Sequence, residues 1–129
     1  MTTRMMASAA LAAALVAGCS SSSGPRLTAA DFAPGSCRDA APALLGLHAT
    51  ARHVLRSRHA DLAAAAVAVK RDQAALRALR PDQPLSAAVR DVVVAAGYFR
   101  IRVDSRTFDA SLARSLDAAY TAVERRCVA

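Results

Sequence analysis

Three cysteines are the residues with the most distinctive chemistry in this 129-residue sequence. Cys19 follows an apolar run at 7–17 and precedes four serines, Cys37 precedes the first segment with a helical pattern, and Cys127 is the third residue from the end. A cysteine can carry an acyl chain, form a disulfide or ligate a metal through its thiolate. The residues around each cysteine indicate which of these chemistries applies.

The segment that precedes Cys19 has the features of an export signal. Arg4 supplies a positive charge, and the apolar run at 7–17 is shorter than the roughly 20 residues that cross a bilayer. The motif Val16-Ala17-Gly18-Cys19 resembles the lipobox of bacterial lipoproteins. By this resemblance, the chain is cleaved before Cys19, whose sulfur is diacylated. A cleaved secretory signal with a chance cysteine and a buried cysteine after an apolar helix are the alternatives.

This interpretation divides the chain into a signal peptide (1–18), a lipidated cysteine with a flexible tether (19–36) and a helical domain (37–129). Four serines, a glycine and a proline follow Cys19, a composition typical of a flexible linker. Two acyl chains give stable anchoring, which one chain does not. We therefore expect an extracytoplasmic protein that is anchored to the cell membrane through Cys19.

The other two cysteines are expected to pair. Outside the cytoplasmic membrane disulfides are permitted, and Cys37 and Cys127 are the two cysteines that remain beside Cys19. Neither is part of a C-x-x-C motif or has a suitably spaced histidine. The sequence favours a Cys37–Cys127 disulfide over two free thiols or half of a metal site.

Four amphipathic segments follow the tether and predict an all-α, up-down four-helix bundle closed by that disulfide. Asp39, Asp61 and Asp109 are the expected N-caps of the first, second and fourth helices, and the third helix is expected from Leu85 to Val103. Thr28 and Asp31 form a capping-box pair. No glycine or proline separates the first two helices at 57–60, so one bent helix is the alternative there. The alternation at 98–103 also fits a strand, although the longer period from Leu85 favours a helix.

The mature chain as a whole resembles the small helical lipoproteins of high-GC actinobacteria. The features that carry the resemblance are the lipobox, the CRDAAPALL opening of the first helix, the FRIRVDSRTFD joint between the last two helices, and the terminal cysteine. The resemblance transfers no catalytic residue and no cofactor.

Neither a metal site nor a catalytic site is expected from the residues. His48, His53 and His59 are five and six residues apart, so adjacent histidines do not share a helix face. No nucleophile elbow, paired carboxylates or glycine-rich phosphate loop is present in the sequence. We therefore predict a protein that is not an enzyme and binds no cofactor.

A basic ladder is the remaining candidate site. If the first helix reaches residue 59, His48, Arg52, Arg56 and His59 follow a 4-4-3 spacing on one face. The chain after residue 18 keeps 16 basic and 10 acidic side chains. A tethered basic domain is attracted to anionic lipid headgroups or envelope polymers, and a solvated face without a ligand is the alternative. Nucleic acid is not expected at this location.

The expected function is that of a lipid-anchored extracytoplasmic interaction or envelope-associated module. The alternative is a protein that binds a small apolar or anionic ligand between its helices. A closed core favours the first function, and a polar-lined pocket between the helices favours the second.

Overall fold

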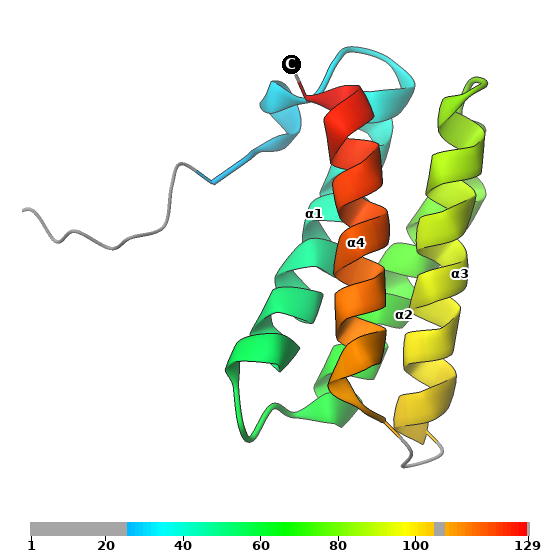
Figure 1. Ribbon diagram of the computed structural model, residues 1–129. Helices are drawn as coiled ribbons and strands as arrows, with labels where there is room; N and C mark the ends of the chain where they lie inside the picture. Colours follow the sequence, from blue (N-terminus) through cyan, green and yellow to red (C-terminus); the bar gives the residue numbers. More distant parts are fainter. Residues whose placement is uncertain (1–25, 105–107, 129) are drawn as a thin grey trace, which may run out of the picture.

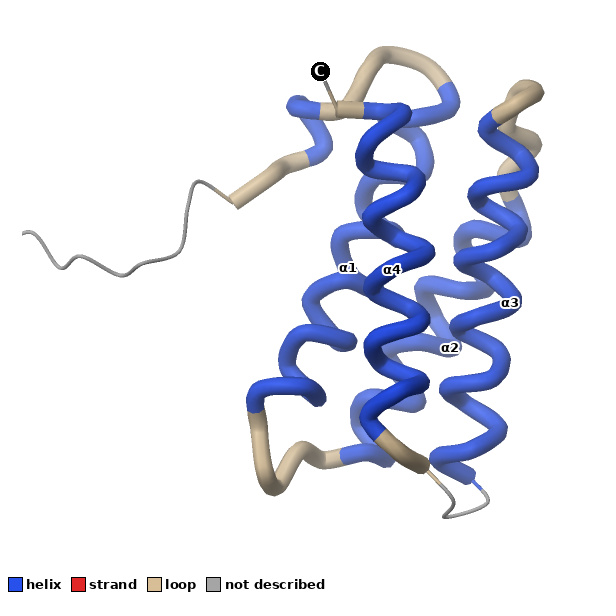
Figure 2. The backbone as a smooth tube through the Cα atoms, viewed as in Figure 1, coloured by secondary structure: helices blue, strands red, loops and turns tan. Residues whose placement is uncertain are grey.

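The computed structural model describes residues 26–104 and 108–128, and these residues form a bundle of antiparallel helices. The elements are a short 3-10 helix, η1 (Ala29–Asp31), and the helices α1 (Ser36–Arg56), α2 (Leu62–Ala78), α3 (Leu85–Asp104) and α4 (Ala110–Cys127). The chain runs up and down through the bundle, and its described part is built of helices and loops (Figures 1 and 2). Each helix packs on the helix that follows it in the sequence, and the first and last helices, α1 and α4, pack on each other. The predicted fold class is confirmed; the predicted signal peptide and Cys19 lie outside the described residues.

Two of the predicted N-caps are confirmed by their hydrogen bonds. The Asp61 carboxylate accepts from the backbone N–H of Ala64 at 3.0 Å, and that of Asp109 accepts from the N–H of Ser111 at 2.7 Å. Both aspartates have extended backbone, as N-caps do. The Thr28–Asp31 capping box is also present, around η1. These local side-chain interactions explain why the helices begin at these residues.

The predicted start of the first helix at Asp39 is wrong by one turn. Helix α1 begins at Ser36, after Gly35, whose φ of 87° is in the region that favours glycine. The N–H of Asp39 donates to the Gly35 carbonyl at 3.0 Å, so Asp39 is already inside the helix. Pro42 therefore lies in the second turn, where it cannot donate a backbone hydrogen bond to the Arg38 carbonyl.

The structure resolves both alternatives that the sequence left open, a single bent helix at 57–60 and a strand at 98–103. Helix α1 ends at Arg56 and α2 begins at Leu62, so the first two helices are distinct. Residues 98–103 are helical. Phe99 is fully buried whereas Ile101 is 64% exposed, so the burial pattern does not follow the alternation that a strand requires.

The core is built mainly of alanine, valine and leucine, with three buried aromatic rings: Phe32, Phe99 and Tyr120. Phe32 comes from the predicted tether, yet it is only 1% exposed. It pairs with Val128 in an isolated antiparallel bridge, and the N–H of Ala33 donates to the Cys127 carbonyl at 2.8 Å. The prediction of a tether throughout 19–36 is therefore wrong for the part around Phe32. Burial of the phenyl ring stabilises the attachment of this part of the chain to the bundle.

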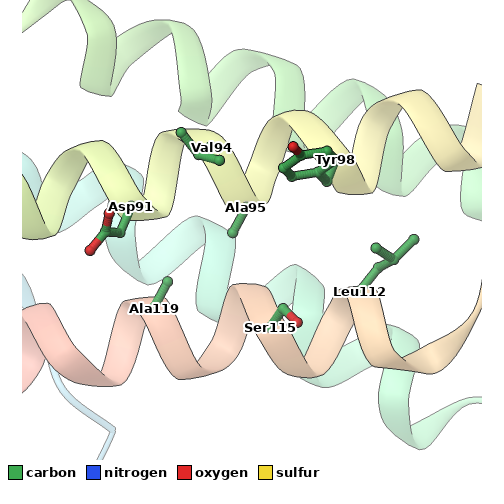
Figure 3. A pocket seen from close by; sticks show the side chains of 7 residues that line it. All are labelled: Asp91, Val94, Ala95, Tyr98, Leu112, Ser115 and Ala119. Atoms are coloured by element: carbon green, nitrogen blue, oxygen red, sulfur yellow. The ribbon is translucent and has the colours of Figure 1, made fainter.

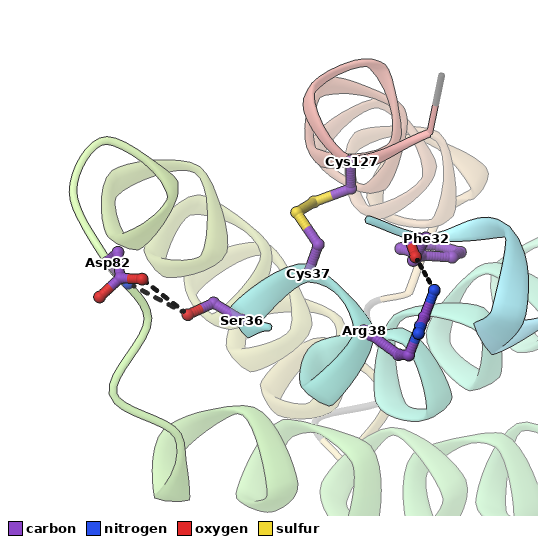
Figure 4. The surroundings of a disulfide bond; sticks show 6 residues. All are labelled: Phe32, Ser36, Cys37, Arg38, Asp82 and Cys127. Carbon is purple, nitrogen blue, oxygen red and sulfur yellow. Dashed lines mark hydrogen bonds between the residues drawn. A yellow bond between two sulfur atoms is a disulfide. The ribbon is translucent and has the colours of Figure 1, made fainter. Parts of the chain in front are cut away.

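The Cys37–Cys127 disulfide joins the first turn of α1 to the last residue of α4 (Figure 4). The two Cα atoms are 5.4 Å apart, within the range that disulfides require. The bond confirms the predicted pairing, and the two cysteines are 90 positions apart in the sequence. The disulfide thus closes almost the whole described domain into one loop.

We predict that loss of this bond strongly destabilises the bundle. In the chain-entropy model, opening a loop of this length lowers the free energy of unfolding by up to about 4 to 5 kcal/mol. Urea unfolding of the Cys37→Ser/Cys127→Ser variant measures this loss, and the reduced wild type is the matched control. Mass spectrometry of a non-reduced digest should contain the cross-linked peptide. Equal stability of the oxidised and reduced protein would contradict the prediction.

Gly46 allows α1 and α2 to approach closely. A Cβ atom at this position would overlap the side chain of Asp72, which is only 6% exposed in the interface. The Arg71 guanidinium contacts the Asp72 carboxylate at 3.1 Å and 3.3 Å and partly neutralises it. The absence of a side chain at residue 46 is therefore needed to accommodate this carboxylate.

We predict that Gly46→Ala destabilises the protein even though alanine favours helix formation by about 1 kcal/mol over glycine. The overlap forces Asp72 or the helices to move, and such overpacking costs about 1 to 3 kcal/mol. Thermal unfolding measures the difference. Gly97→Ala is the control, because its Cβ would meet only the end of the Gln73 side chain, at 3.2 Å. A Gly46→Ala variant as stable as wild type would exclude a close approach at this point.

Candidate functional site

The predicted basic ladder is divided into two parts by the fold. Helix α1 ends at Arg56, so His59 lies in the following loop and the predicted continuation of the helix to residue 59 is wrong. The physical reason is the Asp61 cap, which begins a new helix immediately afterwards. His48 and Arg52 lie beside α4, whereas Arg56 and His59 lie at the end of the bundle.

His48 and Arg52 are engaged by a carboxylate of α4. His48 Nδ1 lies 2.5 Å from Oδ1 of Asp117, and the Arg52 guanidinium lies 4.0 Å from Oδ2 of the same residue. Because an ionised carboxylate can only accept, Nδ1 is the donor in this hydrogen bond. The imidazole also stacks on the Tyr120 ring, with the ring centres 4.3 Å apart. These two basic residues therefore hold α1 against α4.

Tyr120 is the buried centre of this contact. It is 1% exposed, and burial raises the pKa of its phenol well above the usual range. The nearby Glu124 raises this pKa further by its hydrogen bond and charge, and Asp117 adds a smaller effect in the same direction. The phenol therefore stays protonated in the folded protein over the physiological range.

The His48–Asp117 pair has the geometry that orients a catalytic imidazole, but a base also needs a nucleophile or substrate to act on. In the described part of the chain, Asp117 is the side chain that hydrogen-bonds to His48. No group of three histidine, cysteine or carboxylate side chains among residues 26–104 and 108–128 could hold a metal ion. We therefore interpret the pair as a contact between helices.

The other part of the ladder lies in a short segment with a high density of positive charge. Residues 52–59 contain three arginines and two histidines and no carboxylate. Arg56, Arg58 and His59 are exposed, and the next acidic residue, Asp61, caps α2. The exposed part of this segment, Arg56, Arg58 and His59, can bind an anion without breaking a contact that supports the bundle.

A shallow groove between α3 and α4 is a second surface feature (Figure 3). Its volume is about 310 Å³, and it is flanked by Val94 and Tyr98, which are 51% and 60% exposed. The lining residues are Asp91, Val94, Ala95, Tyr98, Leu112, Ser115 and Ala119. This groove was not predicted from the sequence, although the apolar residues 94, 98 and 101 repeat at helical spacing beside the core stripe of α3.

Two further observations concern membrane-spanning helices and similarity to known proteins. None of the helices in the described residues is both long enough and apolar enough to cross a membrane. Comparisons with protein-family models, with curated proteins and with solved structures found no match.

We predict that stability decreases above about pH 10 and that Tyr120 causes part of this decrease. The pKa of Tyr120 is raised in the folded state, so above that pH the unfolded chain releases the phenol proton while the folded protein retains it. The contribution of the Tyr120 phenol to the free energy of unfolding is thus fully present below about pH 10 and is lost at higher pH.

Urea unfolding at several values between about pH 8 and 11 measures this dependence for wild type and Tyr120→Phe. The Tyr120→Phe variant should lose stability less steeply with pH than wild type. Tyr98→Phe, which removes an exposed phenol, is the matched control and should follow the wild-type curve. Identical slopes for all three proteins would show that Tyr120 makes no such contribution.

Proposed function

We propose that the protein is a lipid-anchored, extracytoplasmic helical module that makes contacts within the cell envelope. The observation that carries this proposal is the Val16-Ala17-Gly18-Cys19 motif directly after the apolar run at 7–17. Acylation of Cys19 would hold the chain at the membrane, and two acyl chains suffice for stable anchoring.

The disulfide supports export of the domain. Disulfides persist in oxidising compartments and are rare in the reducing cytoplasm. The Cys37–Cys127 bond closes the bundle at the end where residue 26 enters it (Figures 1 and 4). An anchor at Cys19 would therefore attach to the end of the bundle that is covalently closed.

The closed core supports an interaction module over a protein that holds a ligand between its helices. The interior is lined mainly by buried apolar side chains, with Asp72 and Gln73 as buried polar residues, and in the described residues no buried side-chain polar atom lacks a hydrogen-bond partner. The groove between α3 and α4 is open at the surface and is at the lower limit of typical ligand pockets. Its charged residue, Asp91, would repel an anionic ligand.

The surface that we propose for envelope contacts is the basic segment at the end of α1. Arg56 and His59 of the predicted ladder belong to it, and Arg58 adds a third basic side chain. His48 and Arg52 are not part of this proposal because Asp117 engages both. The positive charge of the segment favours lipid headgroups or polymers with negative charge.

We predict that Cys19→Ala abolishes lipidation and membrane attachment. The variant lacks the sulfur that receives the acyl chains, so it should accumulate as the unprocessed precursor or be released from membranes. Intact-protein mass spectrometry and membrane fractionation measure these outcomes. Ser20→Ala, which keeps Cys19, is the matched control and should behave as wild type. Membrane attachment of Cys19→Ala with an unchanged mature mass would overturn the proposed anchoring.

A further inference from the structure

The basic segment lies at the opposite end of the bundle from the point where the chain enters. Residue 26, η1 and the disulfide are at one end, and the loop between α1 and α2 is at the other (Figure 1). Helix α1 has 21 residues and therefore separates the two ends by about 30 Å. The proposed anchor and the basic segment thus belong to opposite ends of the domain.

The length of chain between Cys19 and residue 26 limits how the domain can face the membrane. Seven Cα–Cα steps separate the two positions, so this linker spans at most about 25 Å. Inverting the bundle onto the same membrane would require a linker at least as long as the bundle, which is about 30 Å. When the bundle stands upright on the membrane, the basic end is therefore directed away from the membrane that holds the anchor.

The charge at this end is available for a ligand. Arg56 and Arg58 have no ion pair with the carboxylates of the described residues, and Asp61 is engaged with the Ala64 N–H. Two exposed histidines, His53 and His59, flank the arginines. An arginine guanidinium presents a fork of N–H donors that matches phosphate and carboxylate groups.

We propose that this tether-distal basic end, defined as His53, Arg56, Arg58 and His59, binds a linear polyanion of the cell envelope, not the headgroups of the anchoring membrane. A polymer with repeated negative charges can contact both arginines at once and release several counterions, which gives affinity without a preformed pocket. The direction of the basic end rests on the proposed anchoring at Cys19. The polymer contact itself requires only the charged surface.

The test uses the full lipidated protein reconstituted into phosphatidylcholine vesicles, with fluorescent long-chain inorganic polyphosphate as the probe. Flotation of the vesicles measures both anchored protein and bound polymer. We expect Arg56→Gln/Arg58→Gln to weaken polymer binding at least about tenfold, since each basic side chain near an anionic surface contributes roughly a fivefold effect. Added salt should weaken wild-type binding.

Arg125→Gln/Arg126→Gln is the matched control because it removes the same charge from the anchor end, in the last turn of α4. This variant should retain polymer binding within about twofold of wild type, since the polymer contacts the other end. An equal loss in both double variants would show that binding follows net charge, and would overturn the proposal. Absence of salt-dependent binding by the wild type would also overturn it. Circular dichroism establishes that the variants remain folded.

Two further measurements separate this proposal from its premise. Polymer binding by the protein in neutral detergent tests the basic end without a membrane. Flotation of the vesicles with the protein but without the polymer tests the anchor. Vesicles that contain phosphatidylglycerol test the competing contact with headgroups. If these vesicles abolish the polymer binding that the wild type shows in detergent, the basic end binds its own membrane and the proposal is wrong.

Discussion

The contact between α1 and α4 is the constraint on which the rest of the bundle depends. In each of the other three pairs of adjacent helices, one helix begins within a few residues of the end of the other, whereas α1 and α4 are the first and last helices of the described residues. A loop between neighbouring elements therefore does not hold them together. The contact is secured instead by the Cys37–Cys127 bond, the Phe32–Val128 bridge and the His48–Asp117 pair.

Close approach of the helices also determines how the polar side chains of the interior are satisfied. Small side chains let helices approach closely, so a polar group between them must find its partner locally. Gln73 does so between α2 and α3, where its amide donates to the Val93 carbonyl at 2.9 Å and accepts from Arg100 at 2.6 Å. Asp72 occupies the space left by Gly46. Polar contacts of this kind fix the register of helices whose apolar faces alone are nearly uniform.

The parts of the structure that could be predicted from the sequence are those fixed by local interactions. The caps at Asp61 and Asp109 depend on a side chain and the next few backbone groups. The disulfide could be predicted because two cysteines remain beside Cys19, one near each end of the domain's sequence. The start of α1 was misplaced because a glycine of positive φ, Gly35, can begin a helix without a side-chain cap. Phe32 and the His48–Asp117 pair depend on contacts with α4, more than 60 residues away, which a local pattern cannot indicate.

Whether a basic residue of the predicted ladder is engaged depends on whether a carboxylate of α4 lies within reach. Asp117 neutralises the side of α1 that faces α4, so the positive charge of residues 48–59 is displaced toward the end of the helix. The groove with α3 lies on a different side of α4 from Asp117, since Ser115 and Ala119 line it while Asp117 contacts α1. A ligand at the basic end and a protein packed along the α3–α4 groove would therefore occupy separate surfaces. The disulfide joins α1 to α4 at the end of the bundle opposite to the basic end, so the covalent closure and the basic end are separated by the length of α1.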